Sequence, residues 1–331
     1  MATYKAFYIQ ENSDGSLQRS VVQRDTGDLP ANEVLVKVQY SSLNFKDAMS
    51  AHGNKGVTRA FPHQAGIDAA GVVEESTNSD FKPGDKVIVT GYDLGMNTAG
   101  GLAQYIRVPA AWVLRCPRGL NPKRSMLFGT AGLTAQLCIN KLKRLGVTPE
   151  KGPVLVTGAT GGVGSIAVAL LAGEGYDVVA SSGKAEQADM LRELGASEVI
   201  DRAEFSEANR RPMLQERFAG AVDVVGGDTL NNVIKSLRAG GSVACCGLVQ
   251  SPVFEATVLP FILRGVNLLG VDSVEIPLPA KQAAWKQLAR NAKLPAIELL
   301  NREIALQQVP TALEELFSGA MVGHTYVKIG R

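Results

Sequence analysis

A glycine cluster between two apolar runs is the part of this sequence best suited to bind an anion. Four glycines lie at positions 158–164, after the apolar run 154–156 and before a helical pattern at 166–172. Because glycine adopts backbone conformations that a Cβ obstructs, the pattern predicts a strand, a tight turn and a helix. The N–H groups and dipole of such a helix point at whatever lies above the strand. We therefore expect a pyrophosphate group at this turn.

The segment Ala159–Gly164 differs from the dinucleotide fingerprint G-x-G-x-x-G only at its first position, where alanine replaces glycine. A glycine pattern by itself also fits an ordinary strand-to-helix turn. Here a second apolar run, 177–180, follows at the distance that a βαβ unit requires. This context favours a dinucleotide site.

The residues after the second run indicate which dinucleotide binds. An NAD-preferring site places Asp or Glu there, whereas this chain has Ser181-Ser182-Gly183-Lys184. Hydroxyl groups and an ammonium suit a 2′-phosphate, and Arg202, after the next short run 197–201, adds a second cation. We therefore predict NADPH rather than NADH as the cofactor. The alternative is that both cations are solvated surface residues.

Length and composition narrow the class of protein. A chain of 331 residues with 45% hydrophobic content exceeds a typical single core, so two domains are expected. A net charge of +2 gives no support for nucleic acid or an acidic membrane as a partner. No stretch has the length of a membrane span, and the N-terminus lacks an apolar signal core, so we expect a soluble, cytoplasmic protein. The four cysteines show no metal-ligand spacing, and structural disulfides are not expected.

The predicted elements change character along the chain. Up to about residue 123, short alternating runs separated by turn residues are typical of a small β-barrel. A helix is then expected from Ser125 to about Leu145, followed by strands that alternate with helices in a doubly wound α/β sheet. The six expected strands are 154–156, 177–180, 197–201, 221–227, 242–246 and 268–271. The terminal apolar run 325–329 is expected to return to the first domain.

Several motifs together resemble those of a known family. They are Ser41–Asp47, Ala65–Gly71, Phe81–Asp85, Gly129–Ala135 and Thr157–Gly164. This set resembles the zinc-free, quinone-oxidoreductase-like branch of the medium-chain dehydrogenase/reductases. Within that branch, the segments 246–248, 260–264 and 270–274 look like the YhdH-type acryloyl-CoA reductase subgroup.

The resemblance implies a fold and an assembly. A GroES-like β-barrel catalytic domain of residues 1–123 is completed by residues 296–331. A Rossmann NADPH-binding domain, with a doubly wound parallel sheet, spans residues 124–295. Relatives are usually homodimers, often through the edge strand that corresponds to residues 266–271 here.

The sequence also argues against a zinc site. Zinc-dependent relatives hold the metal partly through a Gly-His-Glu segment, which here reads Gly66-Ile67-Asp68, and isoleucine cannot ligate a metal. Hydride delivery from NADPH to the β-carbon of an activated alkene fits a site without metal. For an acryloyl thioester the product is propanoyl-CoA. An NADPH:quinone or general enone oxidoreductase is the alternative enzyme, and a noncatalytic NADPH-binding protein is the third interpretation.

The resemblance also assigns site residues by position. Asn44 and Asp47 are the candidate catalytic pair, orienting the substrate or the nicotinamide, although they could instead cap a turn after the strand that ends near Tyr40. Phe45 stands where the subgroup commonly has tyrosine and is expected to pack on the nicotinamide. The other expected cofactor contacts are Thr160, Gly161, Gly162 and Val163 at the pyrophosphate, Ser182, Gly183, Lys184 and Arg202 at the 2′-phosphate, and Leu248, Ile262 and Ser273.

Overall fold

The computed structural model describes residues 2–330, which form two compact units. The first unit contains the chain up to Ala131, residues 273–292 and the chain from Asn301 onward. The second contains residues 132–272 and 293–300. The helix α9 (Leu278–Asn291) therefore packs with the first unit, where the sequence-based boundary at residue 295 places it with the second. Those boundaries otherwise stay a prediction.

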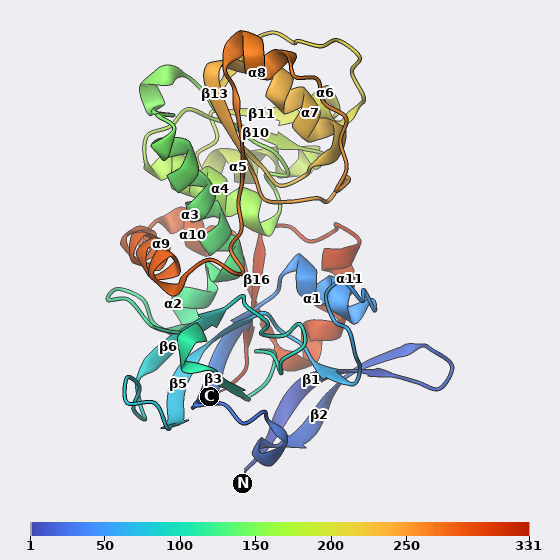
Figure 1. Ribbon diagram of the computed structural model, residues 1–331, viewed down its shortest axis with the longest axis vertical. Coiled ribbons are helices and arrows are strands. Elements are labelled where there is room, and N and C mark those ends of the chain that lie inside the picture. The colour runs from blue at the N-terminus through green and yellow to red at the C-terminus, as the bar shows by residue number, and fades with distance from the viewer. Residues whose placement is uncertain (1, 331) are drawn as a thin grey trace. The chain divides into compact units, whose positions relative to one another are not determined.

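The second unit is built on a six-stranded parallel sheet in the order β11-β10-β9-β12-β13-β14. Figure 1 labels β10, β11 and β13 of this sheet. This arrangement confirms the predicted doubly wound fold. The strand order reverses direction between β9 and β12, and ligands of such sheets bind at the carboxyl ends of the strands at this point. The strands are β9 (Val154–Val156), β10 (Val178–Ser182), β11 (Glu198–Asp201), β12 (Phe218–Asp223), β13 (Leu237–Cys245) and β14 (Asn267–Gly270).

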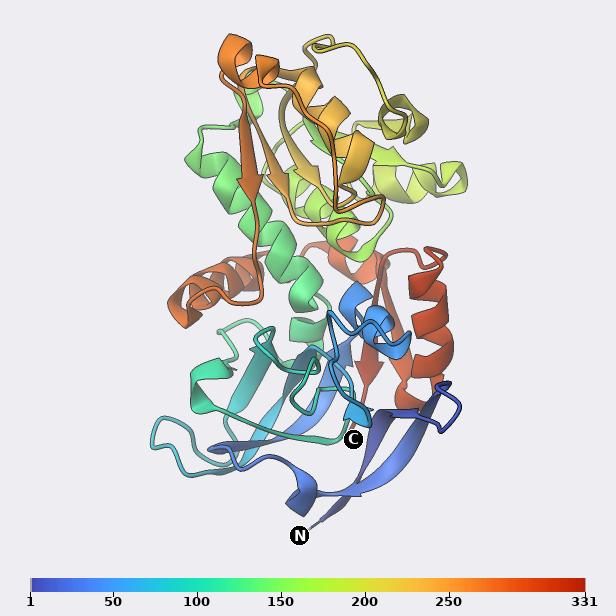
Figure 2. The same ribbon diagram turned by 45° about the vertical axis from the view of Figure 1, so that its right-hand side comes forward.

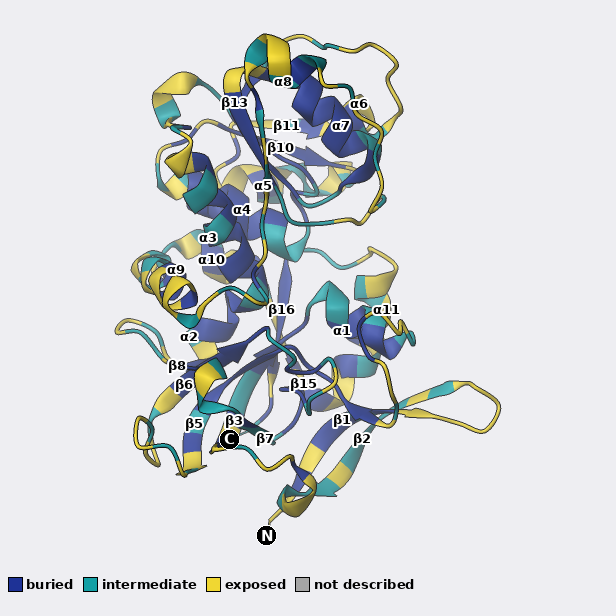
Figure 3. Cartoon of the chain, viewed as in Figure 1, coloured by how far each residue is buried: buried dark blue, intermediate teal, exposed yellow. Residues whose placement is uncertain are grey.

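Helices connect these strands, as alternation of strand and helix requires in a parallel sheet. All three residues of β9 are buried, which is typical of a strand covered on both faces. In contrast, α8 buries only Pro260, and Figure 3 colours part of this helix as exposed. The connecting helices are α4 (Gly162–Gly173), α5 (Ala188–Glu193), α6 (Ala203–Ser206), α7 (Gly227–Ser236) and α8 (Leu259–Arg264). Helix α3 (Gly129–Arg144) precedes β9, and α10 (Pro295–Leu299) follows β14.

The prediction of a single helix from Ser125 to about Leu145 is wrong in one respect, because two helices separated by a short interruption form there. Helix α2 (Pro122–Met126) ends before Leu127, and α3 begins at Gly129. Gly129 has a φ of 51°, and a Cβ on it would lie 2.2 Å from the Ser42 hydroxyl oxygen. The break therefore lets the start of α3 approach β3 (Val34–Ser42) closely.

The first unit contains two sheets (Figures 1 and 2). A three-stranded sheet has the order β2-β1-β4, and a seven-stranded sheet has the order β15-β16-β3-β5-β6-β8, with β7 paired to β3. The C-terminal strand β16 pairs antiparallel with β3, which confirms that the terminal run returns to this unit. The remaining strands are β1 (Thr3–Glu11), β2 (Leu17–Asp25), β4 (His63–Gln64), β5 (Asp68–Ser76), β6 (Lys86–Thr90), β7 (Tyr105–Val108), β8 (Val113–Arg115), β15 (Asn301–Ala305) and β16 (His324–Lys328).

The two faces of the β5–β6 pair have different roles. Ala69 pairs with Val89, and both belong to the main hydrophobic core of the unit. Because successive side chains alternate between faces, the adjacent pair of Asp68 and Thr90 lies on the opposite face. The alternation therefore places a carboxylate and a hydroxyl together outside that core. The other helices of the unit are α1 (Phe45–Ala51), which follows β3, and α11 (Val309–Phe317), which precedes β16.

Candidate functional site

The glycine turn of the second unit has the geometry that its sequence predicts. Gly158 has a φ of 57°, and a Cβ on it would lie 2.6 Å from Val224 Cγ2. A Cβ on Gly164 would lie 2.3 Å from the carbonyl oxygen of Gly158, so α4 packs directly on the turn. The N–H of Gly161 donates to that same carbonyl at 3.0 Å. The first N–H groups of α4 therefore begin at the end of β9, where an anion can be bound.

Ala159 explains why the fingerprint tolerates alanine at its first position. Its side chain is fully buried, and its N–H donates to the carbonyl of Ser181 at 3.1 Å. Among the non-glycine residues that the structure describes, only Tyr92 has a positive φ, so Ala159 has an ordinary backbone conformation. A methyl group is accepted here without backbone strain.

The predicted 2′-phosphate residues come together at the ends of β10 and β11. The hydroxyl of Ser182 accepts the N–H of Lys184 at 3.0 Å and lies 3.3 Å from the hydroxyl of Thr160. A Cβ on Gly183 would lie 2.5 Å from Arg202 Nε, so the side chain of Arg202 lies directly against this glycine. Burial lowers the pKa of Lys184, against an opposing effect of Glu186. Two basic side chains and two hydroxyls thus surround one short loop.

The other predicted cofactor residues differ in exposure. Leu248 is 50% exposed and Ile262 on α8 is 69% exposed, and both belong to the second unit. Ser273 is buried and belongs to the first unit.

Asp223, at the end of β12, is a polar residue of this region that sequence reasoning missed. It is fully buried and accepts hydrogen bonds from the Thr157 hydroxyl at 2.7 Å and the Gly226 N–H at 2.9 Å. Burial raises the pKa of its carboxyl group. Asp223 thereby ties the end of β9 to the turn after β12. Its position inside the apolar run 221–225 was the available signal.

In the first unit, a hydrogen-bond network converges on the buried carboxylate of Asp68. Its Oδ2 accepts from the Ser42 hydroxyl at 2.5 Å, Asn44 Nδ2 at 2.8 Å and the Thr130 N–H at 2.8 Å. Its Oδ1 accepts from the Thr130 hydroxyl at 2.5 Å. Sequence reasoning did not select Asp68, although its place in the Gly66-Ile67-Asp68 segment was a signal.

Asn44 and Asp47 lie at the start of α1, and the capping arrangement considered as an alternative is present. Asn44 is the N-cap of α1, and its N–H donates to Asp47 Oδ2 at 2.8 Å. The other oxygen, Asp47 Oδ1, accepts from the Ile67 N–H at 3.0 Å. Asp47 is fully buried, and this burial raises its pKa to about 7. Asp47 therefore connects the helix start to the segment that carries Asp68.

His324 is a third buried titratable group beside this network. Continuing the register of β16 and β3 places it opposite Asn44. Its Nε2 lies 3.2 Å from the carbonyl oxygen of Met126. Burial lowers the pKa of His324 to about 4, although Asp68 opposes this shift, so the imidazole is neutral at pH 7.

Phe45 forms part of an aromatic stack rather than standing alone. Its ring lies 6.2 Å from that of Phe317 on α11, with an interplanar angle of 10°. Phe317 also stacks on His52 at 3.7 Å. Phe45 is half-buried, so part of its side chain remains accessible on the first unit.

The residues at the expected zinc position do not fit a metal ion. Ile67 offers no donor atom, and both oxygens of Asp68 already accept hydrogen bonds from protein groups. His63, the nearest histidine in the sequence, uses Nε2 toward the Gly95 carbonyl at 2.8 Å. No group of three potential His, Cys, Asp or Glu ligands occurs among residues 2–330.

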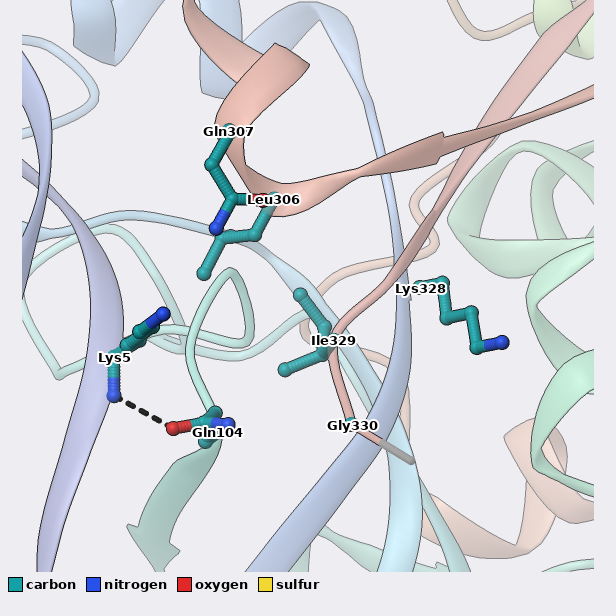
Figure 4. Close-up of a pocket in the computed structure, with 7 residues that line it drawn as sticks. All are labelled: Lys5, Gln104, Leu306, Gln307, Lys328, Ile329 and Gly330. Atoms are coloured by element: carbon teal, nitrogen blue, oxygen red, sulfur yellow. Dashed lines mark hydrogen bonds between the residues drawn. The ribbon is translucent and has the colours of Figure 1, made fainter.

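One pocket of the first unit is lined by residues other than those of the Asp68 network. It has a volume of about 340 Å³ and is lined by Lys5, Gln104, Leu306, Gln307, Lys328, Ile329 and Gly330 (Figure 4). Figure 4 shows Lys5 and Lys328 on opposite sides of the chain at Ile329, so their charges do not converge. The pocket contains none of the predicted site residues.

Models of known protein families match residues in both units. The model for the alcohol dehydrogenase GroES-like domain matches residues 30–118, and the model for zinc-binding dehydrogenases matches residues 162–293. The acrylyl-CoA reductase AcuI of Ruegeria pomeroyi is 42% identical over 97% of this chain and 97% of its own length.

Solved structures agree as well. The crystal structure of YhdH from Escherichia coli with bound NADPH has a TM-score of 0.95 and 42% identity, covering 98% of this chain and 100% of its own. The Bacillus subtilis protein YhfP with NAD bound has the same TM-score and identity, covering 99% of this chain and 100% of its own.

The doubly wound sheet, its glycine turn and the GroES-like unit define an oxidoreductase of the dehydrogenase/reductase class. The chain belongs to the medium-chain dehydrogenase/reductases, in their zinc-free, quinone-oxidoreductase-like branch. No helix among the described residues combines the length and apolarity needed to cross a membrane.

Proposed function

We propose that this protein reduces the activated C=C bond of an α,β-unsaturated thioester with NADPH, converting acryloyl-CoA to propanoyl-CoA. The observation that carries the proposal is the Asp68 network, in which an amide and two hydroxyls donate hydrogen bonds to the carboxylate that stands at the acidic position of the zinc-dependent relatives. Such a site orients a substrate through hydrogen bonds without a Lewis acid. The similarity to AcuI over nearly the whole chain supports the choice of substrate.

Residues of the second unit would hold NADPH. Thr160, Gly161, Gly162 and Val163 bring the start of α4 to the pyrophosphate. Ser182, Gly183, Lys184 and Arg202 together form the receptor for the 2′-phosphate, with Arg202 placed by the absence of a side chain at Gly183. Leu248 and Ile262 are the other proposed contacts in this unit, and Ser273, a residue of the first unit, is the remaining proposed contact. When bound, the cofactor supplies a hydride to the β-carbon of the substrate.

Residues of the first unit would orient the reacting groups. Asp68 accepts from Asn44 Nδ2, which fixes the Asn44 side chain that would orient a bound ligand. Asp47 fixes the backbone of Asn44 and thereby acts through it. Phe45, supported by its stack on Phe317, offers an aromatic face to the nicotinamide.

Location and assembly are part of the same proposal. We place the protein in the cytoplasm, where its four unpaired cysteines would remain reduced. A homodimer through the edge strand β14 is expected because relatives usually form dimers, and the exposed apolar residue Leu263 on α8 would be covered in it.

A second candidate is an NADPH:quinone or general enone oxidoreductase. A quinone oxidoreductase of Sus scrofa is 27% identical over 72% of this chain and 71% of its own length. The aromatic stack at Phe45 would also suit a flat quinone ring.

One assay separates the two candidates. The purified protein is mixed with NADPH and either acryloyl-CoA or a simple quinone, and the loss of NADPH absorbance is followed, with NADH as the control cofactor. Rapid oxidation of NADPH with the thioester and little with the quinone is expected. The reverse ratio would make the protein a quinone or enone oxidoreductase, and silence with both substrates would leave only NADPH binding.

A further inference from the structure

A fully buried lysine on α9, Lys281, is not among the residues proposed to contact the substrate or the cofactor. The side chain of Lys281 is 0% exposed, and its Nζ donates to the carbonyl oxygens of Thr90 and Val274, each at 2.7 Å. Nζ also lies 3.3 Å from the centroid of the Tyr92 ring. Burying an ammonium is costly unless its charge and donors are satisfied. Carbonyl oxygens and an aromatic face provide that compensation here.

Tyr92, whose ring lies against the Lys281 ammonium, has an unusual backbone conformation. It has a φ of 52°, the only positive value at a non-glycine position among residues 2–330. Its N–H donates to the Val274 carbonyl at 3.1 Å, and its ring stacks on Trp112 with a centroid separation of 5.6 Å and an angle of 12°. A bulky residue keeps a left-handed conformation only where its surroundings fix it, and such strain is common near functional sites.

Two segments meet at Lys281, and each adjoins a residue of the proposed site. Thr90 pairs across the strands with Asp68, and the next N–H, that of Gly91, donates to the Ile67 carbonyl at 3.2 Å. On the other side, Val274 directly follows Ser273. A displacement of the Lys281 ammonium would therefore shift both the strand that carries Asp68 and the segment that carries Ser273.

The hydroxyl of Thr90 adds an observation that points to this place. It is buried, lies on the Asp68 face of the β5–β6 pair, and has no hydrogen-bond partner among the described residues. Buried polar atoms nearly always have a hydrogen-bond partner. Because the Thr90 hydroxyl has none, it does not hold its segment in place beside the Asp68 network, and another contact must do so. The bond from Lys281 to the Thr90 carbonyl supplies that constraint.

We propose that Lys281 is a positioning residue of the enzyme. Its ammonium fixes the Thr90–Tyr92 segment and the Ser273–Val274 segment to each other, so that Asp68 and Ser273 keep the geometry that the ligands require. The inference rests on the proposed function, because it uses the cofactor role of Ser273. Lys281 itself touches neither substrate nor cofactor in this role.

The test compares Lys281→Met with Lys286→Met. Methionine keeps the length and apolar stem of lysine but removes the ammonium, and Lys286 is an exposed lysine on the same helix. Both variants are assayed well below their melting temperatures. We expect Lys281→Met to raise the KM for NADPH by about fivefold or more with kcat changed less than about twofold, whereas Lys286→Met matches the wild type. A lower Tm with unchanged KM would show a purely structural lysine and overturn the proposal.

A second variant keeps the proposal testable if Lys281→Met does not fold. Tyr92→Leu removes the aromatic face but leaves both carbonyl contacts of Lys281, so a smaller rise in the same KM is expected. An unchanged KM in a folded Tyr92→Leu protein would overturn the proposal. Titration of the wild type with NADPH separates this failure from that of the proposed function. A wild type that does not bind NADPH overturns both, and one that binds and turns over alongside unaffected variants overturns only the role of Lys281.

Discussion

Replacing Gly183 with alanine tests how this protein would distinguish NADPH from NADH. The added Cβ would lie 2.5 Å from Nε, 2.6 Å from Cδ and 2.8 Å from Cζ of Arg202. These atoms belong to a flexible side chain at an exposed residue, so Arg202 swings away and the fold is preserved. Gly183 has no positive φ, and alanine therefore adds no backbone strain. The substitution displaces one guanidinium and leaves Ser182 and Lys184 in place.

The expected effect follows from the loss of one charged contact to the 2′-phosphate. Such a contact contributes about 1–2 kcal/mol when solvent screening at an exposed guanidinium is allowed for. This free energy corresponds to about a 5–30-fold fall in kcat/KM for NADPH. The value for NADH, which has no 2′-phosphate, should change less than about twofold. The NADPH-to-NADH ratio of kcat/KM is therefore the quantity to measure.

Two further variants complete this experiment. Arg202→Ala should reduce the ratio by a similar factor, and the double variant should add little because both changes remove the same contact. Arg192→Ala, which removes an exposed arginine on α5, serves as the control. If Gly183→Ala and Arg202→Ala both keep the wild-type ratio, Arg202 does not contact the 2′-phosphate and the reasoning is refuted.

Three other predictions concern the site and its supports. Asn44→Ala should lower kcat several-fold with an unchanged circular dichroism spectrum, and wild-type turnover would remove Asn44 from the mechanism. Burial lowers the pKa of His324 from 6.5 to about 4, so the folded protein binds fewer protons than the unfolded chain between these values. Stability from this group is complete above pH 6.5 and is lost as the pH falls toward 4, by about 3 kcal/mol. In urea unfolding at several pH values, His324→Gln should lose less stability over that range than the wild type, and equal losses would contradict the assignment. Gly164→Ala should lower the free energy of unfolding by about 1–3 kcal/mol, because its Cβ would lie 2.3 Å from the Gly158 carbonyl oxygen, a backbone atom. Gly161→Ala, with the corresponding distance 3.4 Å, is the matched control, and equal stabilities would contradict the packing argument.

The elements of the second unit could be predicted because local patterns determine them. The run 154–156 is β9 itself, and the glycines after it mark a turn that the backbone requires. The six strands alternate with helices, and this alternation alone indicates a parallel sheet. The predicted 2′-phosphate residues also lie close together, because the ends of adjacent parallel strands meet at one edge.

The polar network of the first unit could not be predicted in the same way. Asp68 receives hydrogen bonds from Ser42 and Thr130, which lie 26 and 62 positions away in the sequence. Periodicity reports only neighbours along one element, so it does not identify such partners. Composition likewise does not reveal that Lys281 on α9 is fully buried, because lysine is usually a surface residue.

The pairing of β16 with β3 has a consequence for how the chain acquires its structure during synthesis. β3 ends at Ser42 and β16 begins at His324, so residues 43–323 must be translated before these two strands can meet. Residues 132–272 of the second unit leave the ribosome earlier and contain all six strands of its sheet. Until then the N–H and C=O groups of Tyr40–Ser42 on that side of β3 stay unpaired, and they are open to pairing with other chains. The first unit therefore completes its sheet only after the strands of the second unit have been made, and a chain that ends before β16 would leave Tyr40–Ser42 of β3 without this partner.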